Sequence, residues 1–226
     1  WSKKNKNEIL SSRIDSIKTL NKLIFKNDKL KHIISASATG IYFKDSFNIQ
    51  DEFSKTNPKS FLGTVVQNWE MEVDKISNGK IVLTKLRIGI VFSKYGGFLK
   101  KLFFLNDLRI NPLIDRGNQW QSWIHIDDLA RATQFIINKK LNGVINLVSP
   151  NPCTNYDISL KIIKLNKQPF FSFSTPSSLA RAPFKLMGIT QFFNEIIMNN
   201  QKVFPKKLID SGFVFKFENL KKIVTF

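Results

Sequence analysis

The order of helix-like and strand-like segments is the feature that most limits what this chain can fold into. Residues 6–25 place isoleucine and leucine three and four positions apart, which predicts an amphipathic helix. A short β-rich run at 29–37 follows, then a second helical pattern at 61–75. Residues 81–92 form the clearest strand pattern, between turn-forming segments. Helix, strand, helix, strand in this order predicts an α/β fold with a doubly wound parallel sheet.

The second half of the chain continues the alternation with less regular segments. Residues 96–123 have no firm period, whereas 126–139 predict a helix that opens on two aspartates. A short strand is expected at 143–148, and a longer apolar helix near 178–199. Between them, Thr154 is a plausible N-cap for a further helix.

These segments predict a smaller C-terminal α+β cap beside the sheet. We expect residues 1–150 to form the sheet-bearing part and residues 151–226 to form the cap. No repeat and no low-complexity linker separates the two ranges, so they are expected to be intertwined.

The composition excludes several classes of protein. The net charge of +18 comes from 29 Lys and only 6 Arg, spread over the whole length, whereas nucleic-acid recognition favours arginine and a concentrated stripe. We therefore expect no nucleic-acid partner, although the charge suits an acidic ligand. The absence of a long apolar run predicts no membrane-spanning helix, and we expect a cytoplasmic protein. The single Cys153 and two distant histidines predict no disulfide and no metal site.

Four stretches, taken together, resemble one family. They are SASATGIY at 35–42, LRIGIVFSKYGG at 86–97, RGNQWQSWIHIDDLARA at 116–132 and the tail QKVFPKKLIDSGFVFKF at 201–217. The chain resembles the epimerase-like subgroup of extended short-chain dehydrogenases/reductases, and the resemblance runs over its whole length. The tail narrows the match to this subgroup, which has a distinctive C-terminal cap.

The resemblance implies a partial Rossmann-like fold and a dinucleotide ligand, NADP(H) or NAD(H). Family members begin with a strand and a glycine-rich turn that binds the pyrophosphate at a helix N-terminus. No such turn occurs in this sequence. The resemblance therefore implies that about 60 residues, or two βα units, would precede Trp1.

The resemblance also indicates where catalytic groups would lie. Ser37 matches the serine that contacts the reacting substrate oxygen, although small hydroxyl residues also commonly end a strand. The family's Tyr-x-x-x-Lys helix is replaced here, with Phe61 at the tyrosine position and Val65 at the lysine position. Phenylalanine has no proton to exchange and valine cannot shift a pKa. Tyr42 is a candidate substitute acid.

Cofactor contacts are expected at Glu8 and Arg13, by the match of Arg13 to a cofactor-facing position and by their helical spacing. The alternative is that both are ordinary exposed helix residues. Gly89 and Val91 are expected near the nicotinamide, since an isolated glycine inside a strand fits a close backbone approach.

Substrate contacts are expected at Gln119 and Gln121, which match polar substrate-binding positions of the family. His125 could act as a general base, but a structural, hydrogen-bonded role fits its position before a helix start better.

Three functions remain open at this point. The first is an NAD(P)-binding, nucleotide-sugar-epimerase-like protein acting on a polar small molecule. The second is a non-catalytic, dinucleotide-binding regulatory protein, of the kind tied to division in some plant and cyanobacterial relatives. The third is a basic nucleic-acid binder. Phe61 and Val65 favour the second function over the first, and the scattered lysines speak against the third.

Overall fold

The structure is a computed structural model of the 226-residue chain. It describes residues 2–24, 29–42, 44, 48–56, 58–76, 81–93, 95–96, 108–166 and 171–223.

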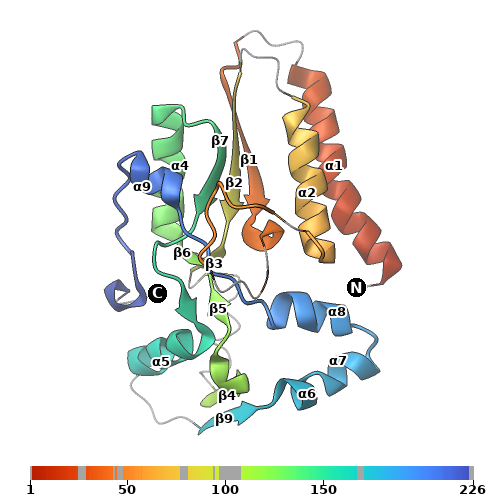
Figure 1. The fold of residues 1–226 in the computed structure, drawn as a ribbon, viewed down its shortest axis with the longest axis vertical. Helices are drawn as coiled ribbons and strands as arrows, with labels where there is room; N and C mark the ends of the chain where they lie inside the picture. The colour runs from red at the N-terminus through yellow and green to blue at the C-terminus, as the bar shows by residue number, and fades with distance from the viewer. Residues whose placement is uncertain are drawn as a thin grey trace.

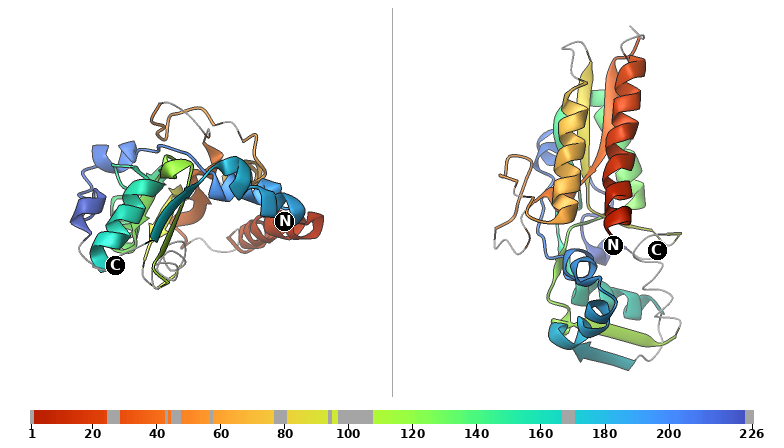
Figure 2. Two further views of the ribbon diagram at one scale, coloured as in Figure 1. Left: turned by 90° about the horizontal axis from the view of Figure 1, so that it is seen from below. Right: turned by 90° about the vertical axis from the view of Figure 1, so that its right-hand side faces the viewer.

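A three-layer arrangement forms the upper part of the molecule (Figure 1). Its parallel sheet has the order β1-β2-β7, and helices cover both faces, two on one side and one on the other, as the views of Figure 2 agree. The sheet consists of β1 (His32–Ala38), β2 (Val82–Ile88) and β7 (Gly143–Leu147), and the helices are α1 (Lys3–Ile24), α2 (Phe61–Asp74) and α4 (Ile126–Lys139). The predicted α/β class with a parallel, doubly wound sheet is confirmed.

Local signals explain why these helices begin and end where they do. The Ser60 hydroxyl accepts the Gly63 N–H at the start of α2, and the His125 ring accepts the Asp127 N–H at the start of α4. Lys140 ends α4 in the left-handed conformation, with φ of 51°. The predicted helices at 6–25, 61–75 and 126–139 are therefore confirmed to within a few residues.

The long strand predicted at 81–92 is two strands. It breaks at Gly89, after which β3 (Ile90–Phe92) leaves the main sheet and pairs with β6 (Trp123–His125). The physical reason lies in packing: a Cβ on Gly89 would stand 2.5 Å from the Ser122 carbonyl oxygen. The chain passes so close to its neighbour that it switches from one sheet to another at this residue.

A smaller α+β body lies below the sheet in Figure 1 and confirms the predicted mixture of elements. A parallel pair and a short antiparallel pair form its strands. These are β4 (Ile110–Ile114) with β9 (Phe171–Thr175), and β5 (Trp120–Gln121) with β8 (Cys153–Thr154). This body also contains the 3₁₀ turn η2 (Asp115–Gly117) and the helix α5 (Asn155–Asn166). A further 3₁₀ turn, η1 (Thr39–Ile41), follows β1 in the upper part of the molecule.

The single helix predicted near 178–199 is wrong. The segment consists of α6 (Ser177–Ala180), α7 (Ala182–Leu186), α8 (Thr190–Phe192) and a π-helical turn, η3 (Phe193–Ile197). Pro183 lies in the first turn of α7, and Gly188 adopts a φ of 68°. A proline has no N–H for a continuous helix, and a left-handed glycine ends one, so the apolar pattern is cut into short turns.

The C-terminal tail returns to the upper body through α9 (Lys206–Asp210) and η4 (Leu220–Lys222). Leu208, Phe213 and Phe215 join the core cluster that includes residues of β7 and α4. The β4–β9 and β5–β8 pairs also join residues on either side of position 150. These pairings show the expected intertwining, while the domain limits 1–150 and 151–226 stay a prediction.

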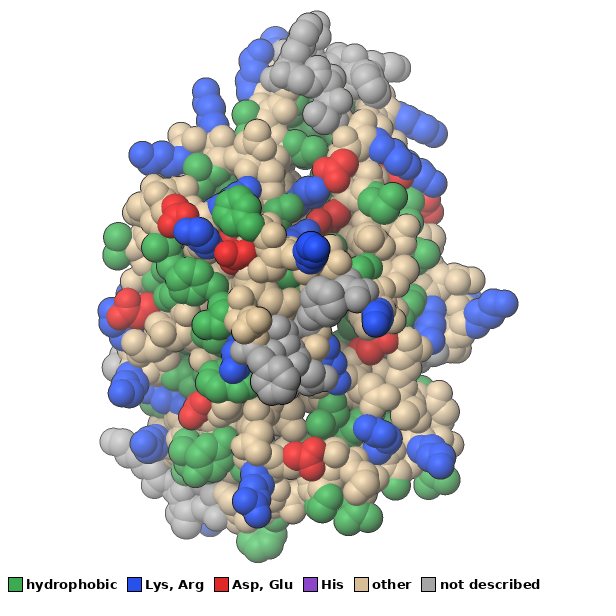
Figure 3. Space-filling model, viewed as in Figure 1, with side chains coloured by type: hydrophobic (Ala, Val, Ile, Leu, Met, Phe, Trp, Pro, Cys, Tyr) green, Lys and Arg blue, Asp and Glu red, His purple; other side chains and the backbone are tan. Residues whose placement is uncertain are grey.

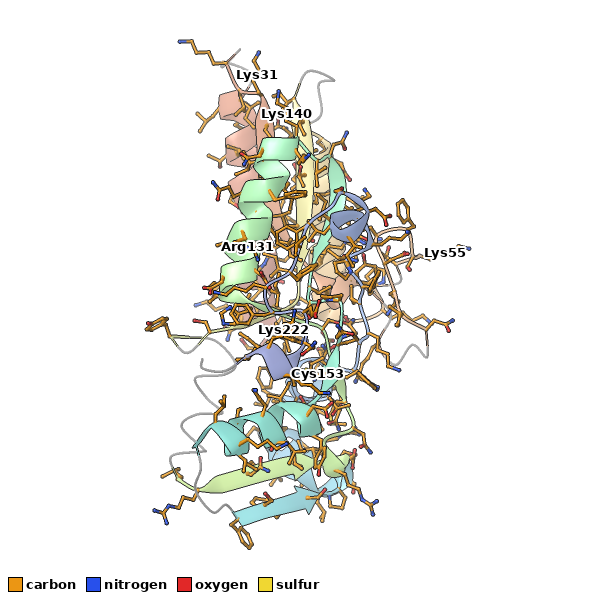
Figure 4. All side chains as sticks on the ribbon, turned by 90° about the vertical axis from the view of Figure 1, so that its left-hand side faces the viewer. Lys31, Lys55, Arg131, Lys140, Cys153 and Lys222 are labelled. Carbon is orange, nitrogen blue, oxygen red and sulfur yellow. The ribbon has the colours of Figure 1, made fainter. Side chains whose placement is uncertain are left out.

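The surface charge is spread over the molecule. Figure 3 shows lysine and arginine side chains scattered over the face that it draws. Figure 4 labels Lys31 and Lys140 at the upper end of the molecule, Lys55 at its side and Lys222 lower down. Within the described ranges, no helix combines the length and apolar character needed to cross a bilayer.

Candidate functional site

A row of polar side chains crosses the sheet near the carboxyl ends of its strands. Ser37 of β1 is in register with Arg87 of β2, and Arg87 is in register with Asn146 of β7. Residues that pair in register point to the same face, so these three side chains form one line. The carboxyl ends of parallel strands are where such sheets bind ligands.

A buried ion pair lies at the centre of this row. Arg87 donates from Nε and Nη2 to the two carboxylate oxygens of Glu70 on α2, at 2.8 and 2.7 Å, and the two side chains are only 7% and 8% exposed. The Ser37 hydroxyl donates to the same carboxylate at 2.5 Å. Burial alone raises the pKa of the Glu70 carboxyl, but the hydrogen bonds and charge of Arg87, with Ser37, hold that pKa below its usual value. The Glu70 carboxylate therefore accepts three hydrogen bonds, two from Arg87 and one from Ser37.

Tyr42 extends the same network toward β7. Its ring lies 4.9 Å from the Arg87 guanidinium, and its hydroxyl donates to Asn146 Oδ1 at 2.8 Å. The side chain is 3% exposed, and this burial raises the pKa of the Tyr42 phenol, partly opposed by Arg87. The Tyr42 hydroxyl is thus protonated and hydrogen-bonded to Asn146 inside the protein. The role of Tyr42 as a substitute acid, like that of Ser37 as a substrate contact, stays a prediction.

The start of α2 shows what replaces the family's Tyr-x-x-x-Lys pair. The N–H groups of Phe61 and Leu62 each donate to a different oxygen of Glu195, both at 2.9 Å, and Gln191 donates to the same carboxylate. Val65 is buried. A carboxylate at a helix N-terminus is favoured by the free N–H groups and the helix dipole, so the cap's π-helical turn is fastened to α2.

The two predicted cofactor contacts on α1 lie in different surroundings. Arg13 donates to the Ile9 carbonyl at 2.7 Å and stacks on Trp69 of α2, 5.5 Å from the ring centre. Glu8 is exposed. Arg13 thus joins the two helices, and a cofactor contact by either residue stays a prediction.

Gly89 and Val91 lie where the chain changes sheets. The close backbone approach predicted at Gly89 is made with the Ser122 carbonyl of the chain itself, and a Cβ on Gly89 would also stand 2.8 Å from Val148 Cγ1. Val91 packs against the cluster that contains Ile124. Their contact with a nicotinamide ring stays a prediction.

Gln119 and Gln121 are both buried at the junction with the cap. Gln119 donates to the Ile114 carbonyl at 3.1 Å and accepts from Asn155 at 3.2 Å, so its amide is satisfied. Gln121 donates to the Asn199 carbonyl at 3.1 Å, while its Oε1 is buried without a partner among the described groups. Substrate binding by Gln119 and Gln121 stays a prediction.

His125 has the structural role that its position before α4 favoured. Its ring accepts the Asp127 N–H at 3.2 Å and lies against Phe217, 3.9 Å between ring centres. Burial lowers the pKa of His125, although Asp127 opposes this. Among the residues that the structure describes, no group of three or more His, Cys, Asp or Glu side chains lies together as a metal site.

The sequence reasoning missed Glu70, Arg87 and Glu195. Glu70 could have been found, because it follows the buried Val66 by four residues and precedes the buried Val73 by three, which puts a carboxylate on the apolar face of α2. Glu195 carries no such signal, because its partners lie 133 and 134 residues away.

Comparison with known proteins identifies the family to which this chain belongs. An epimerase family protein of Staphylococcus epidermidis is 32% identical over 223 residues, which cover 98% of this chain and 72% of the relative. A Staphylococcus aureus epimerase family protein matches to the same extent. This chain belongs to the epimerase family. No protein-family model matches it.

Solved structures show the same fold for epimerase family members. The human epimerase family protein SDR39U1, solved with NADPH, has a TM-score of 0.87 and 23% identity, and the match covers 99% of this chain and 74% of the human one. A nucleoside-diphosphate sugar epimerase from Corynebacterium glutamicum has a TM-score of 0.75 and 26% identity, and the match covers 99% of this chain and 43% of that one. The Rossmann-like fold of the extended short-chain dehydrogenases/reductases is thereby shown, as the sequence resemblance predicted.

Proposed function

We propose that this epimerase family member binds NADP(H) or NAD(H) at the carboxyl ends of β1, β2 and β7, and that it binds without turnover. The family membership and the NADPH in the human relative's structure support a dinucleotide as ligand. The observation that carries the second part is the replacement of the tyrosine and lysine positions by Phe61 and Val65, together with the internal use of the Ser37 and Tyr42 hydroxyl groups.

The described residues fit a dinucleotide only in part. The carboxyl edge of the parallel sheet supplies the usual place for the nicotinamide half. Two groups that could contact a phosphate already have partners among the described residues: the first N–H groups of α2 donate to Glu195, and Arg13 stacks on Trp69. We therefore expect weak, saturable binding.

A bound nicotinamide would supply hydride chemistry, for which the chain must provide a proton donor at the reacting oxygen. The Ser37 hydroxyl donates its hydrogen bond to Glu70, and the Tyr42 hydroxyl donates its hydrogen bond to Asn146. What these residues do in the described state is hold one another in place. These hydrogen bonds favour a non-catalytic, dinucleotide-binding regulatory protein over an active epimerase or reductase.

Fluorescence titration of the full chain with NADPH and NADH tests the proposal, followed by nicotinamide absorbance with candidate nucleotide sugars. We expect binding without any absorbance change. Failure to bind either dinucleotide would contradict the first part, and turnover of a sugar would contradict the second.

Arg13→Ala asks whether Arg13 faces the cofactor. The control is Arg109→Asn, which also removes one arginine charge and suits the left-handed backbone of Arg109, with φ of 59°. A cofactor contact predicts weaker NADPH binding in Arg13→Ala alone. A helix-joining role alone predicts a lower unfolding midpoint with unchanged affinity.

A further inference from the structure

The parallel pair β4–β9, at the lower end of the molecule in Figure 1, has two outer edges. In the described part of the chain no third strand pairs with either of them. The Phe171 N–H donates to the Arg109 carbonyl at 3.0 Å, so the backbone groups of Phe171 point toward β4. Backbone direction alternates along a strand, and the N–H and C=O groups of Ser172 and Ser174 therefore point to the outer edge of β9.

A proline blocks the outer edge of β4. Asn111 and Leu113 direct their backbone groups toward β9, so Pro112, which lies between them, faces outward. Proline has no N–H, and a proline on an edge strand is one of the devices by which proteins prevent the addition of another strand. Residues 171–175 of β9 contain neither a proline nor a charged side chain. The two edges therefore differ, and only that of β9 suits further pairing.

The two faces of this sheet differ as well. The helix α5 lies over one face, where the Ser159 hydroxyl bonds to Asn111 and the Asn111 amide donates to Ser172 Oγ at 3.0 Å. Side chains alternate along a strand, so Phe171 and Phe173 lie on the opposite face. Their ring centres are 5.8 Å apart, and the two residues are 71% and 40% exposed. Exposed aromatic rings beside an unpaired strand edge are typical of an interaction surface.

A second copy of β9 fits this edge by symmetry. When two β9 strands lie antiparallel about Phe173, Ser172 of each copy lies opposite Ser174 of the other. These are hydrogen-bonded pairs, in which every outward N–H and C=O group of the two serines finds a partner. The two Phe173 rings then face each other in the closer, non-hydrogen-bonded pair, with Phe171 of each copy placed diagonally beside them.

We propose that the cap binds a second copy of this chain through β9, in an antiparallel pair centred on Phe173 that joins the two small sheets into one. Residues 171–175 carry no charge that would select a different protein, whereas the spacing of Ser172 and Ser174 about Phe173 matches the strand itself. The net charge of +18 opposes association of two copies. We therefore expect a weak, reversible dimer, as small interfaces give.

Sedimentation equilibrium of the full chain over a concentration series measures this dimer. Ser172→Pro removes an outward N–H and leaves the ladder to β4 intact, and an edge strand tolerates proline. We expect it to weaken the dimer at least about tenfold, because each copy loses one donor. Ser172→Ala is the matched control. It loses the bond from Asn111 but keeps the backbone N–H, so the dimer should change by no more than about twofold.

Phe173→Lys tests the centre of the pair without changing the backbone. Two like charges would then lie directly opposite each other, so we expect the dimer to be lost. Leu179→Lys is its control, because it places the same charge on an apolar residue that is 66% exposed in α6, outside the strand. Raising the salt from about 50 to about 300 mM should strengthen the dimer of the unaltered chain, since salt screens the repulsion between copies.

Four results would overturn the proposal. They are an unaltered chain that stays monomeric at every concentration, a dimer that Ser172→Pro and Phe173→Lys leave unchanged, equal weakening by Phe173→Lys and Leu179→Lys, and a dimer that salt dissociates. Circular dichroism shows whether each variant keeps the fold. If Ser172→Pro disturbs it, the comparison of Phe173→Lys with Leu179→Lys decides.

Discussion

The carboxylate of Glu70 accepts from Arg87 twice and from Ser37 once, in surroundings that exclude most water. Two buried charges lose much hydration energy, and their attraction repays it only while both partners remain. The network then reaches Tyr42 and Asn146 on the far strand. Side chains that were expected to face a substrate therefore brace the sheet in the described state.

Glu70→Gln should destabilise the protein by about 3 kcal/mol or more, because Arg87 is left buried without a counter-charge. The measurement is urea unfolding at neutral pH. Glu218→Gln, which removes a carboxylate from an exposed pair with Lys222, should cost about 1 kcal/mol at most. Equal losses in the two variants would show that the buried pair has no special weight.

The same pair predicts a pH dependence. The pKa of Glu70 in the folded state lies below its unfolded value, so the unfolded chain binds more protons between the two values. The stabilisation is complete above the unfolded carboxyl pKa and is lost as the pH falls through the lowered folded pKa. Unfolding free energy measured along a pH series should fall less steeply in acid for Glu70→Gln than for the unaltered chain.

Tyr42→Phe should cost about 1–3 kcal/mol, because Asn146 Oδ1 would lose its buried donor. Tyr156→Phe is the control, because that side chain is 47% exposed and its change should cost about 0.5 kcal/mol or less. Thermal unfolding compares the two. An unchanged stability in Tyr42→Phe would mean that the hydrogen bond of the Tyr42 hydroxyl does not stabilise the fold, and would leave this hydroxyl available as an acid.

Among the elements, the break between β2 and β3 has the clearest physical cause. Only a residue without a side chain allows the chain to pass the Ser122 carbonyl at this distance. The break lets one run of apolar residues serve two sheets, and it brings β6 and the start of α4 beside the carboxyl edge of the main sheet.

Gly89→Ala should therefore destabilise the protein by about 1–3 kcal/mol, since the added methyl group forces backbone to move. Gly40→Ala is a matched control, because nothing lies within 4 Å of a Cβ at that position. Denaturant unfolding should show little change for the control. A Gly89→Ala variant as stable as the control would contradict the packing account.

Elements with local signals were predicted well, and elements that depend on distant partners were not. The helix at 126–139 agrees because its cap, its acidic first turn and its apolar stripe lie within its own residues. The strands β4 and β9 were missed because each is a strand only in the company of the other. Residues 178–199 have an apolar pattern, but Pro183 and Gly188 outweigh it.

In the candidate site, too, features with a local sequence signal were predicted and features that depend on distant partners were not. Ser37 was predicted to lie at the end of a strand, and it does. That its hydroxyl group would turn toward Glu70 depends on how α2 packs on β1, which no short stretch of sequence records. The Glu195 contact to α2 depends on the whole path of the cap.

At the scale of the whole molecule, the C-terminal tail binds back to the start of α4 and to the core of the sheet. Asp128, fully buried at the start of α4, accepts the N–H groups of Lys216 and Phe217 at 3.0 and 2.7 Å and pairs with Arg131. The tail thereby brings Phe213 and Phe215 into the core of the sheet.

Asp128→Ala should cost about 3 kcal/mol and loosen the tail, because two backbone N–H groups lose their acceptor. Amide hydrogen exchange at Lys216 and Phe217 reports this directly and should accelerate. Asp127→Ala, next in sequence but half exposed, should leave the exchange at both amides slow. Equal protection of the Lys216 and Phe217 amides in the two variants would contradict the role of Asp128 in holding the tail.

The pairing of β4 with β9 joins residues 61 positions apart, as the Asn111–Ser172 hydrogen bond measures. A ribosome making this protein would release the first strand of that pair well before its partner exists. Loop closure over such separations is slow, and unpaired strands invite association with other chains in the meantime. We expect the cap to mature late, so that a chaperone that shields nascent strands should raise the yield of native protein.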